Sequence, residues 1–131
     1  MPELALQSDT VYTWHVEVWT SDSPTPAVSA PAIFSTGLLE QSDWTAVWIR
    51  GGKQMRSTFS VASGTRVARA TLFIAACQYY VAWIDGVRVG DFILDSPWTS
   101  FYTNRSYTTH VIDTAVLAPG ACACPRACRA S

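Results

Sequence analysis

The feature that most constrains the fold is the sequence YYVAWIDGVRVG, which alternates on both sides of Asp85-Gly86. An Asp-Gly pair tolerates the positive φ angles of a type I′ turn, the turn that joins two antiparallel strands most tightly. The sequence therefore predicts a β-hairpin that reverses at these two residues. Because side chains alternate along a strand, Tyr79, Val81 and Trp83 share one face, and we expect that face to be packed, with Trp83 in the core.

A second segment near the N-terminus has the same period of two. In TVYTWHVEVWT, apolar residues from Tyr12 to Val18 fall on one face and polar residues on the other, which indicates a half-buried strand. The Ser- and Pro-rich segment SDSPTPAVSAP follows and is expected to form the turn to a short second strand in AIFSTGL. Two such strands are too few to make a stable domain by themselves.

The run from residue 70 to residue 77 has apolar side chains on both faces. Ala70, Leu72 and Ile74 share one face, and Phe73 and Cys77 lie on the other, as in an interior strand of a sandwich. The sequence has no helix of three turns, although DTAVL, residues 113–117, is typical of a single helical turn. The predicted fold class is all-β.

Charge and hydropathy exclude two classes of partner. The 131 residues include nine basic and ten acidic side chains and a formal net charge of -1, with no basic run. Neither a nucleic acid nor an anionic membrane is therefore an expected partner. The apolar runs are far shorter than the roughly 20 residues that span a bilayer, and the first residues, MPELALQSDT, do not show the basic and apolar regions expected of a targeting signal.

Three of the four cysteines, Cys122, Cys124 and Cys128, crowd into the last ten residues. This spacing could hold a zinc ion, but a closed structural site needs four ligands and both histidines lie far upstream. We therefore expect no metal site here and an unstructured tail over residues 121–131.

Taken together, several motifs resemble a known family. The spaced residues Tyr12, Trp14, Val16 and Val18, followed by FSTGLLEQSDWTAVWI, RSTFSV and ARATLFIAACQYYVAWIDGVRVGDFILDSPWTSFYTNRSYTTHVID, resemble the N-terminal region of bacterial-type α-L-rhamnosidases of glycoside hydrolase family 78. The resemblance runs from about residue 4 to residue 120. It departs from the family pattern at Ser96-Pro97, where the family has Pro-Gly, and after Pro119-Gly120.

The resemblance implies a domain organisation. Residues 1–40 would be the last strands of an immunoglobulin-like or fibronectin type III-like domain. Residues 41–120 would be the first half of a jelly-roll β-sandwich, left incomplete in this chain.

The resemblance also implies that this chain is inactive alone. In the family the catalytic carboxylates lie in an (α/α)6 barrel far downstream, and no residue here matches them. Asp91 and Asp95 form the only close acidic pair near the aromatic cluster, and without an apolar pocket they are expected to be solvated loop carboxylates. His15 and His110 are expected to be surface histidines or satisfied strand histidines. The implied partner is the remainder of the parent hydrolase.

The resemblance further suggests that an accessory sandwich could bind a rhamnose-containing carbohydrate. Aromatic faces pack on a pyranose while carboxylates and amides bind its hydroxyls. After Gly90 the strict alternation ends and a loop is predicted, where binding residues are commonly carried. The candidate residues are Asp95, Trp98, Phe101, Tyr102 and Asn104.

Alternatives to this site remain open. The same rings could fill the sandwich interior, since alternation directs about half of them inward. Calcium, which some related domains bind, would find only three side chains in Asp91, Asp95 and Asn104, so we predict no cofactor. The chain could also be a stand-alone carbohydrate-binding module, or a structural or interaction fragment without a ligand.

Overall fold

The computed structural model describes residues 5–51, 55–100, 102–117 and 122–123, and the chain divides into two compact units, residues 1–48 and 49–131. In the described ranges the regular structure consists of β-strands and two short 3-10 helices, without an α-helix. The all-β class is therefore confirmed. None of the helices in this part of the chain is long and apolar enough to cross a membrane.

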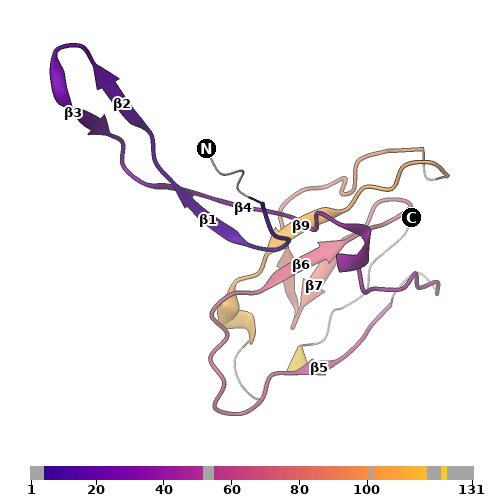
Figure 1. Cartoon of the computed structure of the whole chain (residues 1–131). Helices are drawn as coiled ribbons and strands as arrows, with labels where there is room; N and C mark the ends of the chain where they lie inside the picture. Colours follow the sequence, from indigo (N-terminus) through magenta and orange to yellow (C-terminus); the bar gives the residue numbers. More distant parts are fainter. Residues whose placement is uncertain (1–4, 52–54, 101, 118–121, 124–131) are drawn as a thin grey trace. The chain divides into compact units, whose positions relative to one another are not determined.

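The first unit is built on one long antiparallel ribbon (Figure 1). Its strands are β1 (Val11–Trp14), β2 (Glu17–Thr20), β3 (Ser23–Val28) and β4 (Ala32–Ser35), followed by the 3-10 helix η1 (Gln41–Asp43). β1 pairs with β4 and β2 pairs with β3, so the chain reverses at Ser21 and Asp22. The two strands expected here thus form a hairpin, but one that is longer than the sequence indicated.

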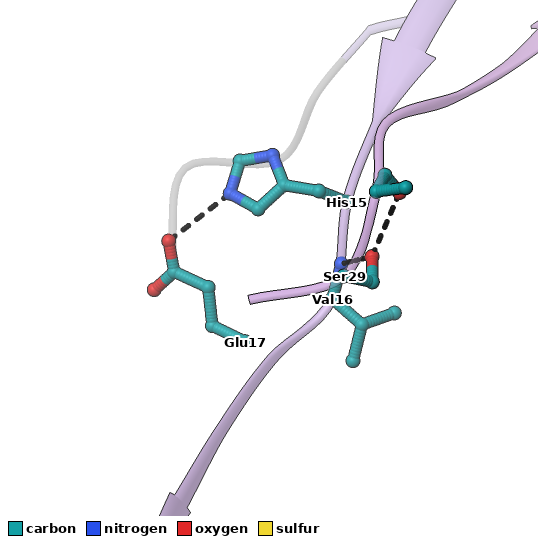
Figure 2. Close-up of polar contacts among 5 residues, drawn as sticks. His15, Val16, Glu17 and Ser29 are labelled. Atoms are coloured by element: carbon teal, nitrogen blue, oxygen red, sulfur yellow. Dashed lines mark hydrogen bonds and ion pairs between the residues drawn. The ribbon is translucent and has the colours of Figure 1, made fainter. Parts of the chain in front are cut away.

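The ribbon is interrupted between β1 and β2, at His15 and Val16. The Val16 N–H donates to Ser29 Oγ at 3.0 Å (Figure 2). The Ser29 N–H in turn donates to the Val16 carbonyl at 2.9 Å. His15 Nε2 lies 3.0 Å from Glu17 Oε1 at the exposed surface. The single strand predicted from Tyr12 to Val18 is therefore two strands, because the Ser29 side chain replaces a backbone partner at the break.

The turn predicted in the Ser- and Pro-rich segment lies at its first two residues, Ser21 and Asp22, but the segment also contains β3, which was not predicted. Proline has no N–H and is confined to edge strands, and β3 has β2 as its neighbour on one side only in the described structure. Pro24 and Pro26 are compatible with that edge position. Because prolines are rare in strands, the composition of this segment did not indicate β3.

The apolar face of the ribbon is not half-buried. Trp14, Val16 and Val18 are 48%, 45% and 51% exposed, so the predicted burial is wrong for these three residues. Tyr12 is partly buried and stacks on Phe34, with ring centroids 5.3 Å apart and planes inclined by 18°. The described part of the first unit therefore has ring stacking but no buried core.

The second unit holds a small core. Its elements are β5 (Phe59–Ser60), β6 (Thr71–Ile74), β7 (Ala82–Ile84), β8 (Val87–Val89), β9 (Thr108–Val111), η2 (Thr114–Leu117) and β10 (Cys122–Ala123). β6 pairs with β9, β7 with β8, and β5 with β10. Ile84, Ile112 and Leu117 are buried at the centre, and partly buried residues pack around them: Val61, Val67, Ala70, Leu72, Val89 and Val116.

Two local predictions in this unit are confirmed. Asp85 and Gly86 have φ angles of 47° and 81°, as the β7–β8 turn requires. The helical turn predicted in DTAVL is η2.

Within the tail that was expected to be unstructured, Cys122 and Ala123 form β10, while the other residues of that tail lie outside the described part of the chain.

The packed face of the hairpin is the opposite of the one predicted. Tyr80, Ala82 and Ile84 are 4%, 5% and 7% exposed, whereas Trp83 is half-buried and Tyr79 is exposed. The alternation of the strand was predicted correctly, but the face with Tyr79, Val81 and Trp83 was assigned to the core in place of the face with Tyr80, Ala82 and Ile84. On β6, by contrast, all four residues are half-buried, Leu72 against the core and Phe73 edge-to-face with Tyr107, so both faces are covered as predicted.

Candidate functional site

The candidate binding segment is a loop between β8 and β9, as predicted. The described residues from Gly90 to Tyr107 contain no strand. Its base is held by Ser96, which is 4% exposed and donates its hydroxyl to the Ala76 carbonyl at 3.4 Å. Ser96 is therefore a buried anchor within the loop, two residues before Trp98.

The aromatic part of the loop is exposed to solvent. Trp98 is 74% exposed and Tyr102 is 99% exposed, so the alternative in which these two rings fill the interior is wrong. A tight turn presents Tyr102, because the Thr103 and Asn104 N–H groups both donate to the Ser100 carbonyl, at 2.9 and 2.7 Å. Asn104 is exposed, and its backbone carbonyl accepts a hydrogen bond from the Thr99 hydroxyl at 2.9 Å. Phe101 lies outside the described residues.

Asp95 does not lie with the exposed residues. Its side chain is only 18% exposed, and its Oδ2 atom lies 3.5 Å from both Tyr80 Oη and His110 Nε2. The expectation of a solvated loop carboxylate is therefore wrong for Asp95, whereas Asp91 is exposed as expected. Trp98, Tyr102 and Asn104 are thus surface residues of one loop, whereas Asp95 is partly buried beside Tyr80 and His110.

Tyr80, Asp95 and His110 form a buried polar cluster that sequence reasoning missed. Tyr80 Oη and His110 Nε2 are 2.6 Å apart, and the two rings meet edge-to-face with centroids 6.0 Å apart. Tyr80 precedes β7, Asp95 lies in the loop and His110 lies on β9. His110 is thus a strand histidine with hydrogen-bonding partners, as expected. In the sequence, the only sign that Tyr80 would be buried as one of these partners was the alternation that places it on the same face as Ala82 and Ile84.

An apolar tip lies between Gly90 and Asp95. Phe92, Ile93 and Leu94 are 66%, 79% and 62% exposed. The Arg88 guanidinium donates to the Phe92 carbonyl at 2.5 Å, which fixes the backbone at the start of the tip. Three consecutive exposed apolar side chains are unusual for a surface without a contact function.

A shallow pocket of about 170 Å³ lies beside the β7–β8 hairpin, between β8 and the end of β9. Its polar groups are already engaged: Arg88 with the Phe92 carbonyl, and Asp113 Oδ1 with the Ala115 N–H at 2.9 Å. The lining residues are Ile84, Val87, Arg88, Val89, Gly90, Val111, Ile112, Asp113 and Val116. The pocket offers mainly apolar contact and little hydrogen bonding to a sugar.

The described residues contain no group of three or more His, Cys, Asp or Glu side chains placed to hold a metal ion. Of the four cysteines, Cys77 is exposed and reduced, and Cys124 and Cys128 lie outside the described part of the chain. Of the three residues weighed for calcium, Asp95 is directed toward His110. The calcium set is therefore not available as one group of solvated oxygens.

Comparison with known families gives two separate matches. Residues 65–123 match the model described as the α-L-rhamnosidase N-terminal domain. Residues 1–40 match the model of the Rha78A-like, N-terminal immunoglobulin domain, and the two matches together cover most of the chain. The chain belongs to the N-terminal region of the α-L-rhamnosidase family.

Individual relatives of this α-L-rhamnosidase N-terminal region agree. An α-L-rhamnosidase of Formosa agariphila is 26% identical in an alignment that covers 78% of this chain and 14% of the relative. The structure of an α-L-rhamnosidase from Dictyoglumus thermophilum superposes with a TM-score of 0.79 at 25% identity, over 92% of this chain and 16% of that protein. The chain thus spans about one seventh of the length of the relatives it matches.

Proposed function

We propose that this chain is an accessory portion of an α-L-rhamnosidase-type glycoside hydrolase, which helps the parent enzyme to recognise a rhamnose-containing carbohydrate. The observation that carries the proposal is the presentation of Trp98 and Tyr102, 74% and 99% exposed, on one loop of a chain with these family matches. Exposed aromatic faces suit the apolar side of a pyranose ring.

In this proposal the sugar contacts are made by Trp98, Tyr102 and Asn104. The Asn104 amide, on the same turn as Tyr102, can exchange hydrogen bonds with a sugar hydroxyl. Phe101, which lies between Trp98 and Tyr102 in the sequence, remains a candidate. In this proposal Asp95 holds the loop through its contacts with Tyr80 and His110 and does not contact the ligand.

The proposal includes a finer fold. Residues 1–40 would be the closing strands of an immunoglobulin-like sandwich, residues 41–120 the first half of a jelly roll, and the rest of the parent hydrolase the natural partner. Support comes from the pairing of β6 with β9, which brings together two strands separated by the whole β7–β8 hairpin. Such non-consecutive pairing is typical of sandwich topologies.

Titration with L-rhamnose, followed by tryptophan fluorescence, tests the site. We expect a saturable change with the native chain and about a tenfold loss of affinity in Trp98→Ala, because the aromatic contact is removed. Trp19→Ala is the matched control, since it removes a 64% exposed indole from the first unit. A flat titration of the native chain, or equal losses in both variants, would contradict the proposal.

The chain is also expected to be catalytically inert by itself. Incubation of the 131 residues with an aryl α-L-rhamnoside should release no more product than a mock preparation from cells that lack the gene. The reason is that glycosidases need an acid and a second carboxylate across a cleft, whereas Asp95 is occupied by Tyr80 and His110. Turnover proportional to the concentration of the chain would overturn this expectation.

A second candidate function is an interaction piece that contacts protein instead of sugar. Exposed Phe92, Ile93 and Leu94 favour it, because they form a continuous apolar stretch without polar groups, which suits contact with other apolar side chains. In that case the L-rhamnose titration would be flat with and without calcium. A stand-alone binding module would instead bind the sugar with full affinity in the absence of the parent enzyme.

A further inference from the structure

Both ends of the segment from Gly90 to Asp95 lie against the His110 ring. A Cβ atom on Gly90 would lie 3.0 Å from both Cε1 and Nδ1 of the imidazole, which is tighter than most Cβ contacts. At the other end, Asp95 Oδ2 lies 3.5 Å from His110 Nε2. One buried ring, 6% exposed, therefore contacts the start and the end of a segment whose middle residues are solvent-exposed.

Tyr80 adds two links to the same end of the segment. Its N–H donates to the Asp95 carbonyl at 2.8 Å, and its hydroxyl lies 2.6 Å from His110 Nε2 and 3.5 Å from Asp95 Oδ2. A carboxylate only accepts hydrogen bonds, and a tyrosine hydroxyl carries one proton. The assignment that satisfies each group has Nε2–H of His110 donating to Tyr80, and the Tyr80 hydroxyl donating to Asp95.

We propose that Tyr80 and His110 are positioning residues that fasten the Gly90–Asp95 segment at both ends and so fix the base from which Trp98 is presented. Trp98 lies three residues beyond Asp95, and buried Ser96 lies between them. The contact between Tyr80 and His110 is buried, where a hydrogen bond is least weakened by competing water. What the loop binds rests on the proposed function, but the fastening can be measured without any sugar.

The test is amide hydrogen exchange at residue 80, whose acceptor is the carbonyl of Asp95. Tyr80→Phe keeps the ring and removes only the hydroxyl. We expect the residue 80 amide to exchange about tenfold faster in this variant, while amides of the β7–β8 hairpin change less than twofold. Tyr79→Phe is the matched control, because it removes the hydroxyl of the adjacent, exposed tyrosine and should leave residue 80 unchanged.

A conservative rescue separates positioning from general packing. His110→Gln keeps an N–H donor and should exchange more slowly at residue 80 than His110→Leu. Should Tyr80→Phe fail to fold, as judged by its far-ultraviolet spectrum, the pair Asp95→Ala and Asp95→Asn replaces it. Exchange at residue 80 should be slower in Asp95→Asn than in Asp95→Ala, because the side-chain carbonyl of asparagine still accepts a hydrogen bond from Tyr80. Equal exchange in Tyr80→Phe and Tyr79→Phe, or in the two members of a rescue pair, would overturn the proposal.

The outcome is independent of the sugar titration. Fast exchange in Tyr80→Phe together with a flat L-rhamnose titration would support the fastening and contradict the sugar-binding role. Unchanged exchange together with sugar binding that Trp98→Ala abolishes would support the sugar-binding role and overturn the fastening.

Discussion

Replacing Ile84 with alanine is expected to lower the free energy of unfolding of the second unit by about 2 to 5 kcal/mol. Ile84 is 7% exposed and forms the buried centre with Ile112 and Leu117. Removing three carbons there leaves a cavity that so small a core cannot refill by rearrangement. The measurement is urea denaturation followed by circular dichroism, at a protein concentration low enough to exclude association.

Ile93→Ala is the matched control for this substitution. Ile93 lies in the exposed tip and is 79% exposed, so the same loss of carbons should change stability by less than about 0.5 kcal/mol. If the two variants unfold at the same urea concentration, the core of this unit is not where the structure places it.

Gly90→Ala is expected to have a comparable cost for two separate reasons. The φ angle of Gly90 is +69°, a conformation that costs a residue with a side chain about 1 to 2 kcal/mol. The added methyl group would also meet the His110 ring at 3.0 Å, and crowding of this kind costs about 1 to 3 kcal/mol. The same denaturation measurement reports the sum of both effects.

Gly64→Ala separates the two effects. Gly64 has a φ angle of +81°, but no heavy atom lies within 4 Å of the position a Cβ would take. It should therefore bear the backbone cost without the crowding, and Gly90→Ala should be the more destabilising of the two. Equal costs would mean that the His110 ring moves aside without loss of stability.

The parts of this fold that could be predicted are those that neighbouring residues determine. Asp85-Gly86 specifies its turn because few residue pairs accept two positive φ angles, and the loop after Gly90 follows from the loss of alternation. The helical turn at η2 is local in the same sense. Each of these depends on contacts a few residues apart.

The parts that could not be predicted depend on distant contacts. Tyr80, Ala82 and Ile84 are about as apolar as Tyr79, Val81 and Trp83, so alternation alone could not decide which set faces the core. The choice is made by the packing of Ile84 on Ile112 and Leu117, and Trp83 remains half-buried opposite Arg88 on β8. A large stability role for Trp83 does not follow from its strand position.

The candidate site was predicted in the same uneven way. The loop was identified from its composition, whereas the sequence left open whether its aromatic residues face the interior or the solvent. Asp95 was assigned to the surface because its partners are distant in the sequence, 15 residues away at Tyr80 and on β9 at His110. A carboxylate in a polar loop gives no local sign that it will be buried. Only the approach of β9 to the start of β7 provides the partners that make burial favourable.

The two prolines of β3 limit how the ribbon of the first unit can grow along that strand. In the described structure β3 pairs with β2 on one side only, and residues 24 and 26 supply no N–H donor. The register between β2 and β3 also shifts between Val18 and Thr20, so this strand does not offer a regular ladder. Edge-to-edge aggregation along β3 is therefore disfavoured.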